Sequence, residues 1–197
     1  MKTRLTLALV LVLAFGCSNP APPTGPPAAS AATKMPEFRP DNTIKDIMDS
    51  MTGPSADVIW DSVATIVDKN GEHEKYPKTD EEWKTVRRNA VILLEASNLL
   101  LIPGRHVARP GEKAEDPKIE LPPEIIEELI NKDREQWNRL AMGLHDAVMP
   151  AFKAADTKDK QGIGDAAEGI DRACEACHLK YWYPENLQEH LSQRRPQ

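Results

Sequence analysis

The chain has 197 residues, of which 28% are charged and only 5% are aromatic, and its formal net charge is −6. Because no block of like charge is long enough to form a basic arm, these numbers argue against nucleic acid as a partner. Alanine, leucine, glutamate and lysine are plentiful and β-branched runs are scarce, so the composition predicts an all-α protein. The length is sufficient for one domain with a substantial core.

The first 16 residues have the pattern of an export signal. A charged start precedes an apolar run from Leu5 to Phe15, which is shorter than the ~20 residues that a membrane-spanning helix needs. The run leads into the sequence LAFGC, which resembles a bacterial lipobox, where the cysteine is lipidated and becomes the mature N-terminus. We therefore expect residues 1–16 to be removed and Cys17 to anchor a periplasmic protein to the membrane. A plain secretory cleavage near residues 29–32 is the alternative.

The segment after the signal, residues 17–41, is rich in proline and small residues and has almost no large apolar side chains. Such a segment cannot bury enough surface to offset its ordering entropy, and its prolines favour an extended backbone. We expect a disordered tether that holds a folded domain, residues 42–190, away from the membrane surface. Residues 191–197 would form a short tail.

Helical periodicity begins at Thr43. The first block runs to Val67 and is interrupted by Gly53-Pro54, which predicts one kinked helix or two short ones. The second block starts with the capping-box pair Thr79 and Glu82, and it ends at the Pro-Gly pair that follows Ile102. A long polar connection, residues 102–122, follows and need not be ordered.

Two further helical blocks complete the domain. The third begins at Pro122-Pro123 and carries apolar residues to Val148 at alternating spacings of four and three. Asp133 interrupts this row and is expected to lie at its edge, in water. The fourth, residues 163–181, has both of its cysteines on the apolar face. Four amphipathic blocks are most simply satisfied as an antiparallel four-helix bundle, whose handedness the 102–122 connection leaves open.

The last block contains the motif Cys174-x-x-Cys177-His178. Residues three and four apart share one face of a helix, so the two thiols and the imidazole form a local triangle. Two thioether bonds could then hold the edge of a haem while the imidazole reaches the iron. In an exported bacterial protein this spacing is typical of covalent c-type haem attachment.

Three other interpretations of the motif are open. A structural zinc site needs four ligands, and no second Cys or His pair at short spacing follows the signal. A thioredoxin-type dithiol would lie at a helix start after a strand. A disulfide between Cys174 and Cys177 is chemically feasible, and the chain would then be a haem-free helical lipoprotein that acts as an interaction module.

A Cys-x-x-Cys-His motif on the last helix of a four-helix bundle resembles the cytochrome c prime family, the class II c-type cytochromes. The resemblance covers about residues 42–183, and Cys174, Cys177 and His178 are its specific part. It implies one covalent haem c among the helices, with His178 as the proximal iron ligand and the first helix over the distal face. Some members leave the iron five-coordinate and bind nitric oxide or carbon monoxide, whereas others use a first-helix methionine as sixth ligand and carry electrons.

The sixth ligand has to be sought away from the motif. No methionine follows His178, so a sixth ligand comes from upstream, comes from His190, or is absent. The resemblance assigns the role to Met48, with Met51 as the second choice. Ordinary core packing is the alternative for both, since methionine is a flexible gap-filler.

The sequence departs from the family after the haem motif. It reads Tyr181-Trp182-Tyr183 where an arginine usually follows the tyrosine. Lys180 could replace that arginine beside a haem propionate, although a solvated surface lysine is the simpler interpretation. The aromatic trio could shield a haem edge from water, or it could simply pack the end of the helix.

These patterns predict an exported c-type cytochrome that transfers single electrons. They do not predict an enzyme, because the chain has no phosphate loop, nucleophile elbow or second metal motif. A five-coordinate haem protein that binds nitric oxide or carbon monoxide is the alternative. The expected partners are redox proteins and a membrane. A homodimer is open, since an apolar stripe does not distinguish self-association from burial.

Overall fold

The computed structural model describes residues 38–185, which are mostly helical, as the composition predicted. The elements in chain order are α1 (Ile44–Ile47), the π-helix η1 (Met48–Thr52), α2 (Gly53–Trp60), β1 (Ala64–Asp68), β2 (Gly71–Lys75), α3 (Asp80–Leu100), α4 (Pro123–Lys132), α5 (Arg134–Thr157) and α6 (Lys160–Tyr181). The predicted signal, Cys17, most of the tether, His190 and the tail lie outside the described residues. None of the helices from 38 to 185 combines the length and apolar character that a membrane span requires.

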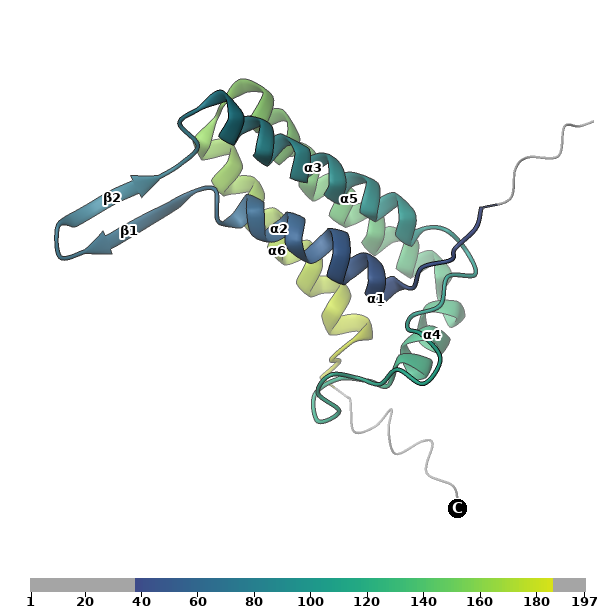
Figure 1. Cartoon of the computed structure of the whole chain (residues 1–197). Coiled ribbons are helices and arrows are strands. Elements are labelled where there is room, and N and C mark those ends of the chain that lie inside the picture. The colour runs from purple at the N-terminus through teal and green to yellow at the C-terminus, as the bar shows by residue number, and fades with distance from the viewer. Residues whose placement is uncertain (1–37, 186–197) are drawn as a thin grey trace, which may run out of the picture. The chain divides into compact units, whose positions relative to one another are not determined.

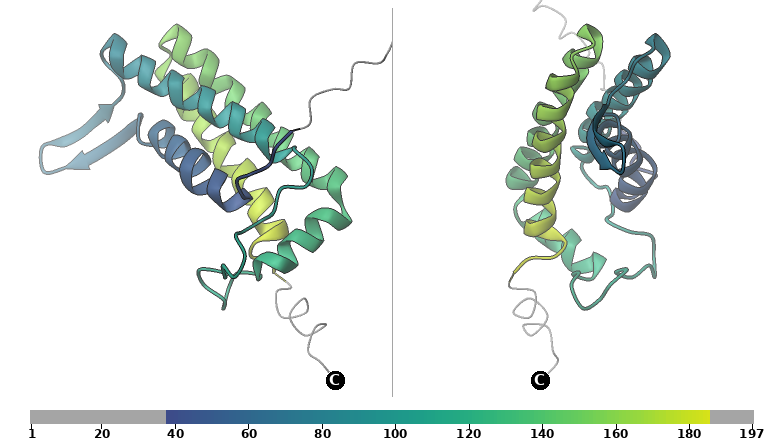
Figure 2. Two further views of the ribbon diagram at one scale, coloured as in Figure 1. Left: turned by 45° about the vertical axis from the view of Figure 1, so that its right-hand side comes forward. Right: turned by 90° about the vertical axis from the view of Figure 1, so that its left-hand side faces the viewer.

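The long helices lie side by side (Figure 1). Helix α5 packs along both α3 and α6, and α2 packs against the same two helices. Helix α4 and the 102–122 connection lie at one end of this assembly, and the hairpin of β1 and β2 extends from the other end (Figure 2). The motif-bearing end of α6 therefore lies close to α4 and far from the hairpin.

The first predicted block is a continuous helical segment over α1, η1 and α2. Its start is fixed by a capping box, in which Thr43 accepts from the backbone N–H of Asp46 and the Asp46 carboxylate accepts from the N–H of Thr43. The interruption predicted at Gly53-Pro54 takes the form of the π-helical turn η1, in which the N–H of Gly53 donates to the carbonyl of Met48. Pro54, which lacks a backbone N–H, is the second residue of α2 and follows directly on this turn.

Residues 64–75 contradict the prediction that the first helical block extends to Val67, and they add a small sheet to the mostly helical chain. They form an antiparallel hairpin instead. The N–H of Asn70 donates to Oδ1 of Asp68 at 2.7 Å, and Gly71 has a φ of +107°, which favours glycine. A β-branched run followed by an Asn-Gly pair favours a hairpin over a helix. Here Lys69 and Asn70 form the turn, and Gly71 pairs with Asp68.

The second block is confirmed. Helix α3 begins with the predicted capping box of Thr79 and Glu82. It ends at Leu100, and the guanidinium of Arg134 donates to the carbonyls of residues 100–102 at 3.0–3.2 Å. The carbonyls at the end of a helix have no partner within it, so this arginine satisfies groups that would otherwise need water.

The third block was predicted as one helix, and that prediction is wrong. The chain leaves helical geometry at Asp133, which has φ −135° and ψ 66° and separates α4 from α5. Its side chain accepts from the N–H of Gln136 at 3.0 Å and so caps α5. Asp133 is exposed, as expected, but its role is to end one helix and begin the next.

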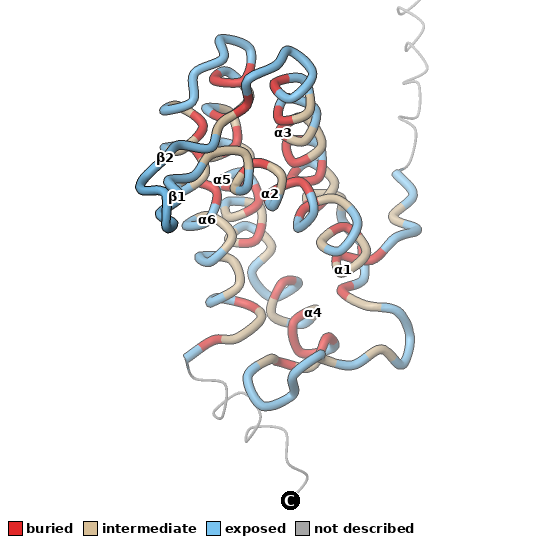
Figure 3. The backbone as a smooth tube through the Cα atoms, turned by 60° about the vertical axis from the view of Figure 1, so that its left-hand side comes forward, coloured by how far each residue is buried: buried red, intermediate tan, exposed pale blue. Residues whose placement is uncertain are grey.

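The core consists of two clusters of buried side chains, visible as the inward-facing red segments in Figure 3. The hairpin-end cluster contains Ala56, Ile59, Trp83, Val86, Ala90, Leu93, Leu94, Leu144, Val148, Ala151, Ala154, Ala155, Ile163, Ala166 and Ile170. The motif-end cluster contains Ile44, Ile47, Ala96, Leu100, Val107, Leu121, Ile125, Ile126, Ile130, Trp137, Ala141 and Tyr181. Helices α3, α5 and α6 contribute to both, and α4 contributes only to the second.

Candidate functional site

The motif residues Cys174, Cys177 and His178 lie in the last turns of α6, which runs without interruption from residue 160 to residue 181. The helix is capped at its start by Asp159, whose carboxylate accepts from the N–H of Gly162 at 3.0 Å. Because the helix is regular across the motif, the three side chains keep the fixed relative positions of residues i, i+3 and i+4.

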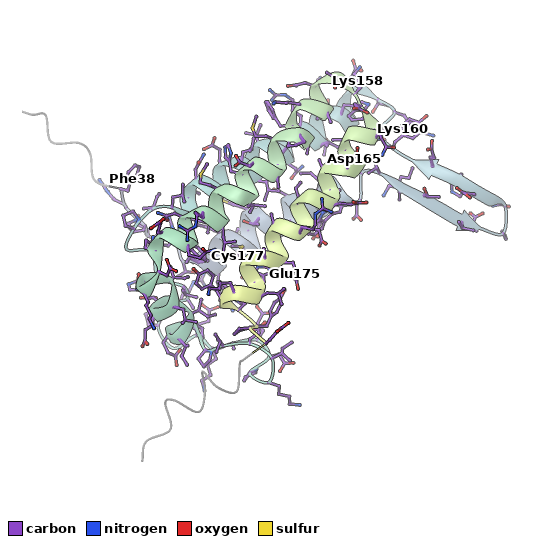
Figure 4. The ribbon with its side chains drawn as sticks, turned by 180° about the vertical axis from the view of Figure 1, so that it is seen from behind. Phe38, Lys158, Lys160, Asp165, Glu175 and Cys177 are labelled. Atoms are coloured by element: carbon purple, nitrogen blue, oxygen red, sulfur yellow. The ribbon has the colours of Figure 1, made fainter. Side chains whose placement is uncertain are left out.

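Both thiols are half-buried and free, and no disulfide joins them. Cys174 packs against the hairpin-end cluster, whereas Cys177 packs against the motif-end cluster, so the motif spans the boundary between the two. Figure 4 shows Cys177 on the side of α6 opposite to the exposed Glu175. The two thiols therefore point toward the apolar interior.

The same burial changes the acidity of the thiols. It raises the pKa of Cys174 to about 11 and that of Cys177 to about 12. Redox-active dithiols have a lowered pKa, because the thiolate is the reactive form. The environment of Cys174 and Cys177 is the opposite of the one that a thioredoxin-type dithiol requires.

The imidazole of His178 is half-buried, and burial lowers its pKa, so the ring is neutral at pH 7. Two aromatic rings lie beside it, that of Trp182 with its centroid at 6.0 Å and that of Tyr183 at 5.7 Å. The carbonyl of His178 accepts from the backbone N–H groups of both residues, at 2.7 and 3.0 Å, which turns the chain back at the end of α6. A neutral imidazole is the form of histidine that binds metal ions.

A hydrogen bond fixes one of these rings. The hydroxyl of Tyr183 donates to Oε2 of Glu175 at 2.7 Å. Burial and this acceptor raise the pKa of Tyr183 to about 12. Glu175 directly follows Cys174 and lies between the two cysteines of the motif. The motif itself therefore supplies the group that holds the ring of Tyr183 near His178. Sequence reasoning did not identify this pair, because no local pattern relates residues 175 and 183.

The sequence did not require the 102–122 connection to be ordered. In the structure, this connection is hydrogen-bonded to the start of the helical segment that contains Met48 and to the end of α6, which carries His178. At one end the N–H groups of Ile44 and Lys45 donate to the carbonyls of His106 and Val107 at 2.9 and 3.0 Å. At the other end the N–H of Leu121 donates to the carbonyl of Trp182 at 2.8 Å. These bonds satisfy groups at the start of α1 and after the end of α6.

Arg105 holds the beginning of this connection in place. Its side chain is only 8% exposed, and it donates to the carbonyl of Leu99 at 3.2 Å and to that of Asn42 at 2.5 Å. Neither this residue nor Leu121 was identified from the sequence. Asn42 is distant from Arg105 in the chain, and Trp182 is distant from Leu121, so no spacing rule could have found these contacts.

The candidate sixth ligands Met48 and Met51 both belong to η1. They are partly buried and pack against the motif-end cluster, as Cys177 and Trp182 do. Met51 also lines a surface cavity of about 480 Å³ together with residues of α1, α3 and the 102–122 connection, and no motif residue lines that cavity. Met48 does not line it. The structure therefore separates the two methionines by their surroundings, and π-helical turns such as η1 are frequent at functional sites.

The remaining residues singled out by the sequence have structural positions. Tyr181 is 1% exposed and meets the ring of Trp137 edge-on, with the centroids 5.4 Å apart. It is thus a core anchor. Trp182 is half-buried and packs against the motif-end cluster, and Lys180 is exposed.

The donor set fits a group held by carbon–sulfur bonds and one nitrogen. Within residues 38–185, no three His, Cys, Asp or Glu side chains gather closely enough to hold a metal ion. A bare zinc ion takes four converging ligands. A haem needs only two thiols for its edge and one imidazole for its iron, and Cys174, Cys177 and His178 offer these.

A scan against protein-family models, a search of curated proteins and a search of solved structures each find no match to this chain.

Proposed function

We propose that the protein is an exported c-type cytochrome of the class II kind, which holds one covalent haem c and transfers single electrons. The observation that carries this proposal is the placement of Cys174, Cys177 and His178 on the last turns of α6, with both thiols against the core and two aromatic rings beside the imidazole. Cys174 and Cys177 would form the thioethers, and His178 would be the proximal ligand.

The same proposal assigns the helices to a four-helix bundle. Its first helix would be the segment from α1 to α2, and the other three would be α3, α5 and α6. The packing of α5 against α3 and α6, and of α2 against the same two helices, supports this assignment. The hairpin and α4 would then be additions between the first and second and between the second and third bundle helices.

The bound haem would supply a one-electron iron couple. The residues of the chain would orient the group and control its exposure to water. His178 presents a neutral nitrogen. The rings of Trp182 and Tyr183 lie 6.0 and 5.7 Å from the imidazole and would limit its exposure to water. The bond from Tyr183 to Glu175 holds the second ring in place. Burial of this kind is one of the means by which proteins set a haem potential.

Met48 is the proposed sixth ligand. It lies in η1 and contacts the motif-end cluster that Cys177 also contacts. Met51 serves as the comparison residue, since it lines a cavity without motif residues. Should the distal side be open, the protein would instead bind nitric oxide or carbon monoxide.

The proposed location is the periplasm, with Cys17 lipidated and residues 17–41 acting as the tether. The leader sequence and lipobox-like LAFGC support this part of the proposal. The physiological partner would be a redox protein that exchanges one electron with the haem. Replacing Cys17 by alanine should release the protein from membranes, and membrane association that persists would contradict lipidation.

The test of haem attachment is the mass of the purified protein after expression with the c-type maturation enzymes. We expect a haem that survives acid–acetone extraction, with the added mass on the peptide containing residues 174–178. The double variant Cys174→Ala and Cys177→Ala should lose all covalent haem, while Cys17→Ala should keep it. Unmodified thiols in the wild-type peptide would overturn the proposal, and the chain would then be the haem-free lipoprotein.

The test of the sixth ligand is the absorption spectrum of the reduced protein. We expect six-coordinate, low-spin iron in the wild type, and five-coordinate, high-spin iron in Met48→Ala. The matched variant Met51→Ala should retain the wild-type spectrum. A high-spin wild type would support the gas-binding alternative, and a low-spin Met48→Ala would remove this residue as ligand.

A further inference from the structure

The hairpin has no share in the core. Every residue of β1 and β2 is exposed, and the hairpin extends away from the helices as an entirely pale-blue loop in Figure 3. Two of its exposed residues are large and apolar: Val67 is 75% exposed and Ile66 is 37% exposed. Exposed β-branched side chains on a projecting strand lose the burial that normally stabilises a sheet.

The hairpin is held only at its base. Lys160, at the start of α6, forms an ion pair with Glu74 and lies 4.8 Å from the centre of the Tyr76 ring; Figure 4 shows this lysine next to the hairpin. Over residues 38–185, each strand pairs only with the other. A two-stranded hairpin without a covering element is marginally stable in water. A further strand or surface on the hairpin would therefore add stability.

The two outer edges differ in chemistry. Strand β1 reads Ala-Thr-Ile-Val-Asp, with one charge at its end, whereas β2 reads Gly-Glu-His-Glu-Lys. Charged side chains protect a strand edge against pairing with another chain. The edge of β2 has this protection, and the edge of β1 lacks it over residues 64–67.

We propose that the β1 edges of two copies of this chain pair antiparallel about a two-fold axis at Ile66, giving a four-stranded sheet of order β2-β1-β1-β2. In this register Ile66 of one copy lies opposite Ile66 of the other, and Val67 lies opposite Thr65. Asp68 lies opposite Ala64, so no like charges face each other. The exposed side chain of Val67 lies diagonal to Val67 of the other copy, which gives it an apolar neighbour.

The sequence of β1 favours this occupant because the edge is complementary to itself. Its uncharged residues 64–67 face residues 65–68 of the other copy, and its single charge, Asp68, faces Ala64.

Other pairings of the hairpin are less favourable. Pairing β2 with itself in the corresponding register would oppose Glu72 and Glu74, as well as His73 with itself. Pairing β1 of one copy with β2 of the next would leave free edges and build an open chain of molecules. The two-fold pairing of β1 closes and opposes no like charges. It is independent of whether the protein holds a haem.

The test is sedimentation velocity on the mature chain carrying Cys17→Ala, so that no lipid adds mass, over about 1–500 μM, the range in which small interfaces associate. We expect a reversible monomer–dimer equilibrium. Ile66→Lys and Ile66→Glu each place like charges opposite one another, and each should raise the dissociation constant about tenfold or more. An equimolar mixture of these two variants should restore dimers.

The matched control is His73→Lys, which adds a charge on the strand opposite Ile66 but on the β2 side. It should dimerise like the wild type. All four proteins should have the same helical circular dichroism, because the substituted side chains lie outside the core. A wild type that is monomeric throughout, dimers that persist in Ile66→Lys, or a mixture that does not pair would each overturn the proposal.

Discussion

The two core clusters are built from different kinds of segment. The hairpin-end cluster is formed by long regular helices, and alanines at positions such as Ala90, Ala151 and Ala166 allow those helices to approach closely. The motif-end cluster receives side chains from a π-helical turn, a short helix and an irregular connection, and it contains the large rings of Trp137 and Tyr181. The packing of the hairpin-end cluster follows from helical periodicity alone, whereas the packing of the motif-end cluster depends on specific long-range contacts.

Hydrogen bonds show the same difference. At the motif end, Nε1 of Trp137 donates to the carbonyl of Leu100 at 2.8 Å, and Arg134 donates to the same carbonyl. Arg105 ties the 102–122 connection to Asn42, and Leu121 ties it to Trp182, and both partners are far away in the chain. A buried polar contact is costly to leave unmade. The motif end should therefore be more sensitive to the removal of single side chains than the hairpin end.

The largest expected effect is at Trp137, which is completely buried in the motif-end cluster. Trp137→Ala should lower the free energy of unfolding by about 3–5 kcal/mol, because it removes a large ring and leaves a cavity. It should also change the reduced absorption spectrum, since the ring supports Tyr181 near the end of α6. Urea unfolding and the spectrum measure the two effects.

Trp137→Phe provides the control for the ring. It keeps most of the apolar volume and removes the N–H that donates to Leu100, a carbonyl that Arg134 still reaches. The loss should be about 1 kcal/mol. A loss as large as that of Trp137→Ala would show that the hydrogen bond, and not the volume, is the main contribution.

The next effect tests the hairpin end. Ile163 is fully buried near the start of α6, about three turns before the motif. Ile163→Ala should cost about 2–4 kcal/mol in urea unfolding. In contrast to Trp137→Ala, it should leave the reduced absorption spectrum unchanged. A spectral change in Ile163→Ala would mean that the two clusters are coupled more strongly than their separate packing suggests.

Caps at the two ends give smaller and matched effects. Thr79 caps α3 at the hairpin end and Asp133 caps α5 at the motif end. Thr79→Ala and Asp133→Ala should each lower the free energy of unfolding by about 1 kcal/mol. Only the second should increase amide hydrogen exchange in α4 and in the last turns of α6, because Asp133 also joins α4 to α5. Equal exchange in both variants would remove this distinction.

How far the fold could be predicted depended on whether local signals agreed with each other. Helix α3 was predicted with its capping box, because periodicity and cap chemistry point to the same residues. The break at Asp133 was missed because the apolar stripes of α4 and α5 continue in phase across it. A stripe alone does not distinguish one helix from two that face the same core.

The hairpin was missed although the sequence contains its signals. The Asn70-Gly71 pair follows a β-branched run, which is typical of a tight hairpin turn. The prediction relied instead on Val63, Ile66 and Val67, whose spacing also fits one face of a helix. In the structure Val63 packs against the hairpin-end cluster, whereas Ile66 and Val67 are exposed and face no core. The apolar character of Ile66 and Val67 therefore did not indicate a buried helix face.

The candidate site also has one part that the sequence predicts and another that it does not. Cys174, Cys177 and His178 were identified because the spacing of the motif is itself the chemical requirement. The contacts of Leu121 with Trp182 and of Glu175 with Tyr183 connect segments through tertiary packing or a chain reversal. No residue pattern marks them, so only the folded chain reveals which groups surround the imidazole.

The smallest expected change in the free energy of unfolding is at Tyr181. Unlike the substitutions above, this one should not lower stability at pH 7. Its hydroxyl is buried and has no hydrogen-bond partner among residues 38–185. Tyr181→Phe removes a polar group that gains nothing from the core, so stability at pH 7 should stay the same or rise by up to about 1 kcal/mol. Tyr183→Phe is the matched variant, and it should lower stability, because that hydroxyl donates to Glu175.

Alkaline pH gives a second readout for Tyr181. Burial raises its pKa from 10.0 to about 12, so between these values the unfolded chain releases a proton that the folded chain keeps. Stability that is fully present below pH 10 should therefore be lost as the pH rises toward 12. Tyr181→Phe should lose less stability over this range than the wild type, as measured by urea unfolding at each pH. Equal losses in both proteins would mean that Tyr181 ionises as readily in the folded chain as in the unfolded one, and that the motif end is open to water at this ring.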